Sequence, residues 1–526
     1  MKTVSQVKKI YSKIDWYKQG AAAKPIYIGH SWKSCLGPLT LRGKRIPFSF
    51  LPFGVYLHKE DLMDVYFPRE RLRAVAEFYY GKEKRQPGFV KNLKRRWERN
   101  EVTALQKIIR KIEKVDLSRL SIREVFDLQK KFSKFYQAFW REAIFVDGFD
   151  VTSDFILEEA LRKEGKKIKE NDLHLLTSPE ELSWIQKEKR ELLEIFRKYK
   201  KSLNVMPDSI GHPGSPEKSG WIPAGVYPAP RCGAGMTDGL GADLKRVLQK
   251  HADKYHWIYN DYAVVHWLDW KFFLKRLREF LDEKVYKEEK MAIADVLQAK
   301  KEKRRLVKKL KLSRRLVRTI NLLVTAAAWR DWRKAYNQRA SGAIRLFIEE
   351  FRKRTALDKN DAEHLWWWEI EGAAKLNRQK RELARKRRLG FFTDGDPEKG
   401  SFLGKDGAEL QAFMTKLLAR SEELRGRAAY HGLVRGRVKI ILSQNDFHKM
   451  KKGDVLVAPN TRPEYAPIMK IAGAIISEEG GLTCHAAIVS RELKVPAIVG
   501  VQGAIAALRD GDLVEVDANI GVVKKL

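Results

Sequence analysis

The chain has 526 residues, enough for three or four domains of about 150 residues each, and its 44% hydrophobic content is that of a globular protein with ample core material. Its 104 Lys and Arg against 67 Asp and Glu give a formal net charge of +37, which favours polyanionic ligands such as nucleic acid, nucleotides or phosphate esters. The basic residues are spread along the whole chain, so a merely soluble basic surface is the alternative.

Cysteine use and the N-terminus bear on location. Cys35, Cys232 and Cys484 form no CxxC pair and no metal-ligand spacing, which fits a reducing cytoplasm and predicts no metal site. The first residues lack the apolar core of a signal peptide. No stretch approaches 18 uninterrupted apolar residues, so we expect no membrane span.

Three regions with different predicted secondary structure follow one another in the chain. Residues 1–90 mix short helical and extended patterns and predict a mixed α/β N-terminal segment. Residues 91–424 predict a largely helical region, interrupted by a Pro/Gly-rich loop at 206–241. Residues 425–526 contain short β-rich runs interrupted by two predicted helices, which is typical of a separate α/β domain.

Start signals place two helices in the central region. Ser121 and Glu124 form a capping box ahead of one, while Ser178, with Pro179 and Glu181, predicts the start of another. Two further stretches, KEKRRLVKKLKLSRRLVRTI and KLNRQKRELARKRR, predict strongly basic helices. Most such runs are solvated faces, but these two are dense enough to leave anion binding open. A short hairpin is expected over 389–404.

An aromatic stretch in the helical region, HADKYHWIYNDYAVVHW, combines rings with polar tips, as ligand pockets do. It predicts an acceptor pocket with a wall that includes His256, Trp257, Tyr259 and Tyr262. Plain helix-on-helix packing is the alternative for the same residues.

The richest motif is GGLTCHAAIVSREL, residues 480–493. A strand, a glycine turn and a helix are expected here, so His485 lies near a helix N-terminus, where unpaired N–H groups favour an anion. That position also disfavours an imidazolium and keeps a ring nitrogen free for attack on phosphorus. A histidine that only caps the helix is the alternative.

The motif resembles the phosphohistidine signature of the phosphoenolpyruvate-utilising enzymes, GG-x-T-[SC]-H-[AT]-A-I followed by P-A-[IV]-V-G, matched here by Pro496 to Gly500. The resemblance covers residues 425–526 and implies a swivelling phosphohistidine domain with His485 as the phosphorylated residue. It implies phosphate-supporting roles for Thr483, Gly480, Gly481 and Cys484, and a weaker one for Arg462. The fold class that follows is multidomain: a mainly α-helical N-terminal and central region plus a C-terminal α/β swivelling domain.

The family usually takes its phosphoryl group from ATP in an ATP-grasp domain, and residues 1–420 carry no recognisable nucleotide signature. We therefore expect a phosphotransferase component that binds no cofactor itself. A separate ATP-grasp or phosphoenolpyruvate-binding partner would charge it from ATP or phosphoenolpyruvate, with Mg²⁺ bound by that partner. The acceptor would be anionic or a small molecule. Two alternatives stay open: a phosphocarrier or regulatory protein, and a basic, nucleic-acid-binding module that reuses the domain as a scaffold.

Overall fold

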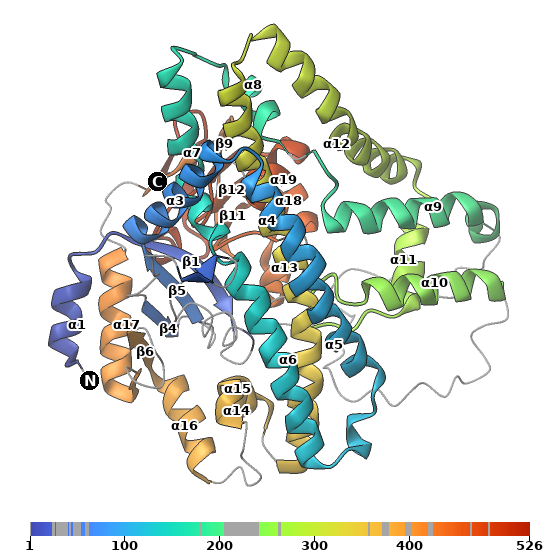
Figure 1. Cartoon of the computed structure of the whole chain (residues 1–526), viewed down its shortest axis with the longest axis vertical. Helices are drawn as coiled ribbons and strands as arrows, with labels where there is room; N and C mark the ends of the chain where they lie inside the picture. The colour runs from blue at the N-terminus through green and yellow to red at the C-terminus, as the bar shows by residue number, and fades with distance from the viewer. Residues whose placement is uncertain are drawn as a thin grey trace.

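The computed structural model describes most of the chain, and Figure 1 shows its arrangement. The described residues are 2–23, 27, 40–41, 44–45, 54–57, 63–178, 180–204, 241–260, 265–355, 358–370, 378–394, 401–418, 424–462, 465–481 and 484–526. The predicted loop at 206–241 lies outside them except for its last residue, Gly241.

An antiparallel sheet joins the N-terminal segment to a hairpin from much later in the chain. Its order is β1-β5-β4-β6-β7, and the predicted hairpin near 389–404 supplies the last two strands. The strands are β1 (Trp16–Ala23), β4 (Gly54–Leu57), β5 (Met63–Pro68), β6 (Phe391–Asp394) and β7 (Ser401–Leu403); β2 (Thr40–Leu41) pairs with β3 (Lys44–Arg45). Helices α1 (Val4–Tyr11) and α17 (Gly404–Leu418) share a small core with this sheet.

The middle of the chain is helical, as predicted, and is organised around one long helix, α13 (Arg314–Thr355). At 1.5 Å per residue its 42 residues extend over roughly 60 Å. Around it lie α3 (Arg69–Arg85), α4 (Phe89–Trp97), a π-helical turn (Glu98–Val102), α5 (Thr103–Lys114), a 3₁₀ turn (Leu117–Arg119), α6 (Ile122–Ala143), α7 (Val146–Lys163), α8 (Glu170–Thr177), α9 (Trp184–Asn204), α10 (Ala242–Tyr255), α11 (Trp270–Glu279), α12 (Glu283–Lys309), α14 (Lys359–Glu363), α15 (Trp367–Ile370) and α16 (Arg378–Leu389).

Helix starts were predicted correctly in one case and wrongly in another. The capping box at Ser121 and Glu124 is present at the start of α6. The start predicted at Ser178 is wrong, because the Ser178 hydroxyl donates 2.8 Å to the Leu175 carbonyl just beyond the end of α8. Helix α9 begins at Trp184 instead, where the Ser183 hydroxyl accepts from the backbone N–H of Gln186.

The first basic run is not one helix but the end of α12, a turn and the start of α13. Lys311 adopts a left-handed conformation, with φ of 47°, which ends α12. The Ser313 hydroxyl then accepts from the backbone N–H of Leu316 at 3.1 Å and starts α13. The serine in KLKLSRRL was the signal that this break could have been read from.

The C-terminal region is an α/β unit with one sheet of order β8-β15-β14-β10-β11-β12-β13-β9. Strands β10 to β13 are parallel neighbours, and β11 and β12 are buried along their whole length because apolar clusters cover both faces. The strands are β8 (Leu424–Arg425), β9 (Arg427–Tyr430), β10 (Leu433–Ile440), β11 (Val455–Ala458), β12 (Ala474–Ser477), β13 (Ala497–Val499), β14 (Leu513–Asp517) and β15 (Val522–Lys525).

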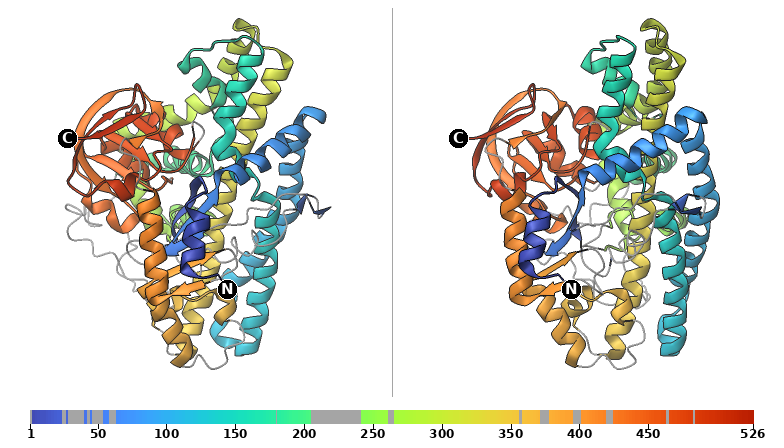
Figure 2. Two further views of the ribbon diagram at one scale, coloured as in Figure 1. Left: turned by 90° about the vertical axis from the view of Figure 1, so that its left-hand side faces the viewer. Right: turned by 60° about the vertical axis from the view of Figure 1, so that its left-hand side comes forward.

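Three α-helices, not the predicted two, lie between these strands: α18 (Ala466–Ile471), α19 (His485–Leu493) and the single turn α20 (Ala504–Ala507), with a 3₁₀ segment at Gln444–Lys449. Figure 2 shows the unit at one side of the helical region, next to α17. Nowhere in the described ranges does a helix carry an apolar run long enough to cross a membrane.

Candidate phosphohistidine site

The strand, glycine turn and helix around His485 form as the sequence predicted. Parallel strand β12 ends at Ser477, and α19 begins at His485. Between them Gly480 has a φ of +107°, and a Cβ on it would lie 2.5 Å from the Cys484 side chain. Only glycine suits that position, and it lets the turn fold directly onto the helix start.

Cys484 is the N-cap of α19. Its Sγ accepts the backbone N–H of Ala487 at 3.4 Å, and the residue is buried. Burial also raises the pKa of the Cys484 thiol, which keeps it protonated. The cysteine therefore has a structural role at the start of the helix.

A hydrogen bond to a threonine holds the imidazole of His485. Its Nδ1 lies 2.9 Å from the Thr461 hydroxyl, on the loop after β11. With the Nδ1 proton donated to that hydroxyl, Nε2 keeps its lone pair. Thr461 was not among the site residues predicted from the sequence, although it directly precedes Arg462, which was.

The ring is kept neutral by its surroundings. Burial and then the positive charges of Lys334 and Arg330, both on α13, lower the pKa of His485 from 6.5 to about 3. A neutral imidazole is the nucleophilic form. The two cations come from the helical region, so the site lies where the C-terminal unit meets α13.

Positive charge gathers on the α13 side of the site. Arg330 and Arg462 are buried, and burial, with the charges of these two arginines, lowers the pKa of Lys334 to about 8, while Glu479 acts in the opposite direction. Glu479 in turn accepts from the Asn460 side chain at 3.1 Å.

A third part of the chain, strand β1, also contacts the glycine turn. The hydroxyl of Tyr17 accepts the backbone N–H of Gly480 at 2.9 Å. Burial raises the pKa of this phenol. The glycine turn is therefore fixed from outside its own unit, by the N-terminal sheet.

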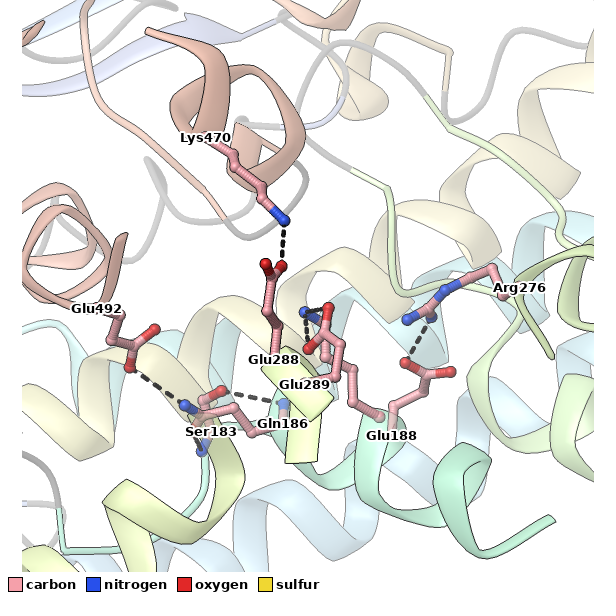
Figure 3. Close-up of polar contacts among 9 residues, drawn as sticks. Ser183, Gln186, Glu188, Arg276, Glu288, Glu289, Lys470 and Glu492 are labelled. Carbon is pink, nitrogen blue, oxygen red and sulfur yellow. Dashed lines mark hydrogen bonds and ion pairs between the residues drawn. The ribbon is translucent and has the colours of Figure 1, made fainter. Parts of the chain in front are cut away.

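Further contacts between the C-terminal unit and the helices include ion pairs and hydrogen bonds, and Figure 3 shows two of them. Lys470 on α18 pairs with Glu288 on α12 at 2.5 Å, and Glu492 on α19 accepts from Gln186 on α9 at 3.3 Å. Burial raises the pKa of Glu492 to about 7. Arg427 pairs with Glu158 on α7 at 2.6 Å.

The structure brings together His485, Gly480, Cys484 and Arg462 of the predicted site residues. Gly481 is buried in the same turn, and its carbonyl accepts the backbone N–H of Cys484 at 3.0 Å. Thr483 lies outside the described residues, as does Tyr262 of the predicted acceptor pocket. Arg330, Lys334 and Tyr17 were missed because nothing near them in the sequence links them to residue 485.

The other predicted pocket residues make packing contacts. His256 stacks on Trp267 with ring centroids 4.2 Å apart. It also lies 3.3 Å from the Glu113 carboxylate. Trp257 is buried against Trp184. Their role as an acceptor wall stays a prediction.

Tyr259, the remaining member of that set, lies next to the C-terminal unit. Its ring packs edge-on against Phe272. Its carbonyl accepts from the Gln444 side chain at 2.7 Å, and the same amide lies 2.9 Å from His266. The aromatic stretch therefore helps to seat the C-terminal unit. In the described ranges no three His, Cys, Asp or Glu side chains group as metal ligands would.

Comparison with known proteins agrees with this geometry. Residues 450–521 match the family PEP-utilising enzyme, mobile domain. The chain is 50% identical over 100 residues to a probable phosphoenolpyruvate synthase of Archaeoglobus fulgidus, which covers 19% of this chain and 13% of that protein. It is 45% identical over 96 residues to phosphoenolpyruvate synthase of Escherichia coli, covering 18% and 12%.

A third relative, the uncharacterised phosphotransferase YvkC of Bacillus subtilis, is 34% identical over 174 residues, or 31% of this chain and 21% of that protein. The matched stretches are thus a small part of each relative. The C-terminal part of the chain therefore contains a mobile domain of the PEP-utilising type.

Proposed function

We propose that His485 is transiently phosphorylated on Nε2 and that the mobile domain passes the phosphoryl group to an acceptor held by the helical region. The observation that carries this is the state of the ring: neutral, fixed through Nδ1 by Thr461, and placed at the start of α19. The Nε2 lone pair forms the N–P bond while the bond from phosphorus to the donor's leaving group breaks.

The cations at the site suit the product of that step. A phosphohistidine carries negative charge at the Nε2 side, and Arg330, Lys334 and Arg462 supply positive charge near it. The N–H groups at the start of α19 add to this. The unphosphorylated site, in contrast, holds these charges close together, which adds to the effect of burial in lowering the pKa of Lys334.

Delivery requires movement, because phosphoryl transfer needs contact and in-line geometry at both donor and acceptor. Solvent-exposed polar contacts of the mobile domain, such as the half-exposed pair Lys470 and Glu288, are the kind that open at small cost. The donor in this proposal is a separate ATP-grasp or phosphoenolpyruvate-binding protein, which also holds Mg²⁺.

Potassium phosphoramidate tests the proposal without the natural donor. The expected result is one acid-labile, base-stable phosphate per chain, lost in His485→Ala, with ammonia as the leaving group. Labelling that persists in that variant would overturn the assignment. Labelled ATP with the chain alone should give no phosphohistidine, and label should appear only when the donor partner is added.

Thr461 supplies a matched pair of variants. Thr461→Val removes the hydrogen bond and should slow labelling about fivefold, the equivalent of about 1 kcal/mol, whereas Thr461→Ser keeps the hydroxyl and should label at the normal rate. Equal rates in both variants would show that Thr461 does not orient the ring.

A further inference from the structure

The turn between α12 and α13 stands at the upper end of the molecule in Figures 1 and 2. Residues 300–318, here named the basic apex, include one acidic residue, Glu302. Lys303 points inward, where it pairs with Glu180. The exposed basic residues of the apex are Lys300, Lys301, Arg304, Arg305, Lys308, Lys309, Lys311, Arg314, Arg315 and Arg318.

These ten side chains form no salt bridge with any residue in the described ranges. The same helix behaves differently further on. Arg333 pairs with Asp147, Arg339 with Glu113 and Arg345 with Glu363. The chain thus pairs its cations with acids where it packs, and leaves those of the apex outside any ion pair with the part of the chain that the structure describes.

The spacing of the apex cations is unfavourable for the helix that bears them. Lys300, Arg304 and Lys308 recur every four residues, as do Lys301, Arg305 and Lys309, so neighbours of like charge lie about 6 Å apart along α12. Like charges at this spacing destabilise a helix. The repulsion is relieved by a ligand with regularly repeated negative charge.

The end of α7 extends the patch. Lys166 donates to the Leu310 carbonyl at 3.1 Å, which fixes the end of α7 against the turn. Arg162, Lys167 and Lys169 are exposed there and add three cations. The patch therefore continues across two hairpins and does not follow a single helix face.

We propose that the basic apex binds the phosphodiester backbone of double-stranded nucleic acid, a function independent of His485. Nucleic-acid interfaces are strongly positive and polar, and Arg and Lys bind phosphates with little regard to sequence. No aromatic residue occurs between 287 and 328, so the surface lacks the stacking platforms that single strands need.

Two other polyanionic partners, an acidic protein surface and an anionic membrane, fit the basic apex less well. Protein interfaces have an apolar or aromatic centre and few lysines, whereas within the basic apex Leu306 and Leu316 are buried and the other apolar residues are at most half-exposed. The apex therefore presents no fully exposed apolar side chain that could enter a bilayer. The apex offers charge without an anchor for either partner.

The experiment measures binding of the full chain to fluorescent DNA and RNA duplexes of about 20 base pairs at several salt concentrations. The apex variant changes Arg304, Arg305, Lys308, Lys309, Arg314 and Arg315 to Gln. The matched control changes six exposed basic residues of α5 and α6 to Gln: Lys107, Lys111, Lys114, Arg123, Lys131 and Lys134. Both variants lose the same charge.

The expected result is a tenfold or greater loss of duplex affinity at about 100 mM salt in the apex variant and a twofold or smaller loss in the control. The slope of log affinity against log salt should fall by up to about 5 in the apex variant, since each phosphate contact of the six changed residues contributes about 0.9. Tighter binding of one duplex would identify DNA or RNA as the source of the backbone.

Equal losses in the two variants would overturn the proposal, because they would reflect net charge alone. Binding of polyglutamate or of anionic phospholipid vesicles as tight as that of the duplexes would also overturn it. Labelling of His485 by phosphoramidate should be unchanged in the apex variant, which checks that the variant folds and separates this inference from the phosphotransfer proposal.

Discussion

His485 should stay uncharged at every pH at which the protein is folded, and this is the sharpest consequence of its surroundings. An unperturbed histidine titrates near pH 6.5, while burial, Lys334 and Arg330 lower the pKa of His485 to about 3. Selective ¹³C labelling of histidine at Cε1 allows the titration to be followed by NMR. His485→Gln identifies the resonance by its disappearance. The resonance should stay at the neutral position from pH 8 to pH 5.

The same shift has an effect on stability with a definite sign. Because the pKa of His485 is lower in the folded state, the unfolded chain alone takes up a proton as the pH falls through 6.5. Stability is therefore lost toward acid. Between pH 7 and pH 5 this one site should cost about 2 kcal/mol, a loss that His485→Gln should not show. The exposed His431, changed to Gln, is the matched control.

The variant Lys334→Met separates the two causes of the lowered pKa of His485, burial and neighbouring positive charge. Burial is the largest cause of the shift and the Lys334 charge the next, so the variant should raise the pKa of His485 but leave it below 6.5. Titration of the wild-type resonance near pH 6.5 would refute the reasoning. It would mean that water reaches the ring or that the mobile domain spends most of its time away from α13.

Two further predictions concern stability. Gly480→Ala should lower the free energy of unfolding by about 1–3 kcal/mol, because its φ is +107° and the new Cβ would meet Cys484 at 2.5 Å; thermal unfolding measures this, and an unchanged midpoint would show that the turn adapts. Arg276→Met should cost about 3–5 kcal/mol, because it leaves the fully buried Glu188 without its 2.7 Å partner (Figure 3). The double change Glu188→Leu with Arg276→Met should cost less in urea unfolding, and an equal cost would contradict the charge argument.

The part of the site predicted from the sequence is the part whose signal is local. The order strand, glycine turn and helix, with His485 at the helix start, follows from neighbouring residues. Arg330 and Lys334 lie on a helix about 150 positions away, and no periodicity in α13 marks them, because its sequence carries basic residues on every side. Tyr17 joins the site only because β1 is placed next to the turn.

The fold shows the same division. The capping box predicted the start of α6 correctly, because Ser121 and Glu124 interact within one turn. Ser178 predicted a helix start wrongly, because its hydroxyl donates to a carbonyl of the preceding helix. Gly426 and Gly432 lie on either side of strand β9, near the start of the C-terminal unit. The structure gives each a packing reason: a Cβ would lie 2.6 Å from the Val499 carbonyl at Gly426 and 2.5 Å from Pro496 at Gly432.

Helix α13 carries two of the cations of the proposed phosphohistidine site and is anchored in the helical region. Arg333 pairs with the buried Asp147 and Arg339 with Glu113, and these pairs tie the helix to α7 and α5 on either side of Lys334. The position of Lys334 and Arg330 is therefore set by the helical region and does not depend on the mobile domain. If the domain leaves to collect a phosphoryl group, it returns to cations that have not moved. A phosphorylated His485 should dock more tightly than the free form, because it adds negative charge beside Arg330, Lys334 and Arg462.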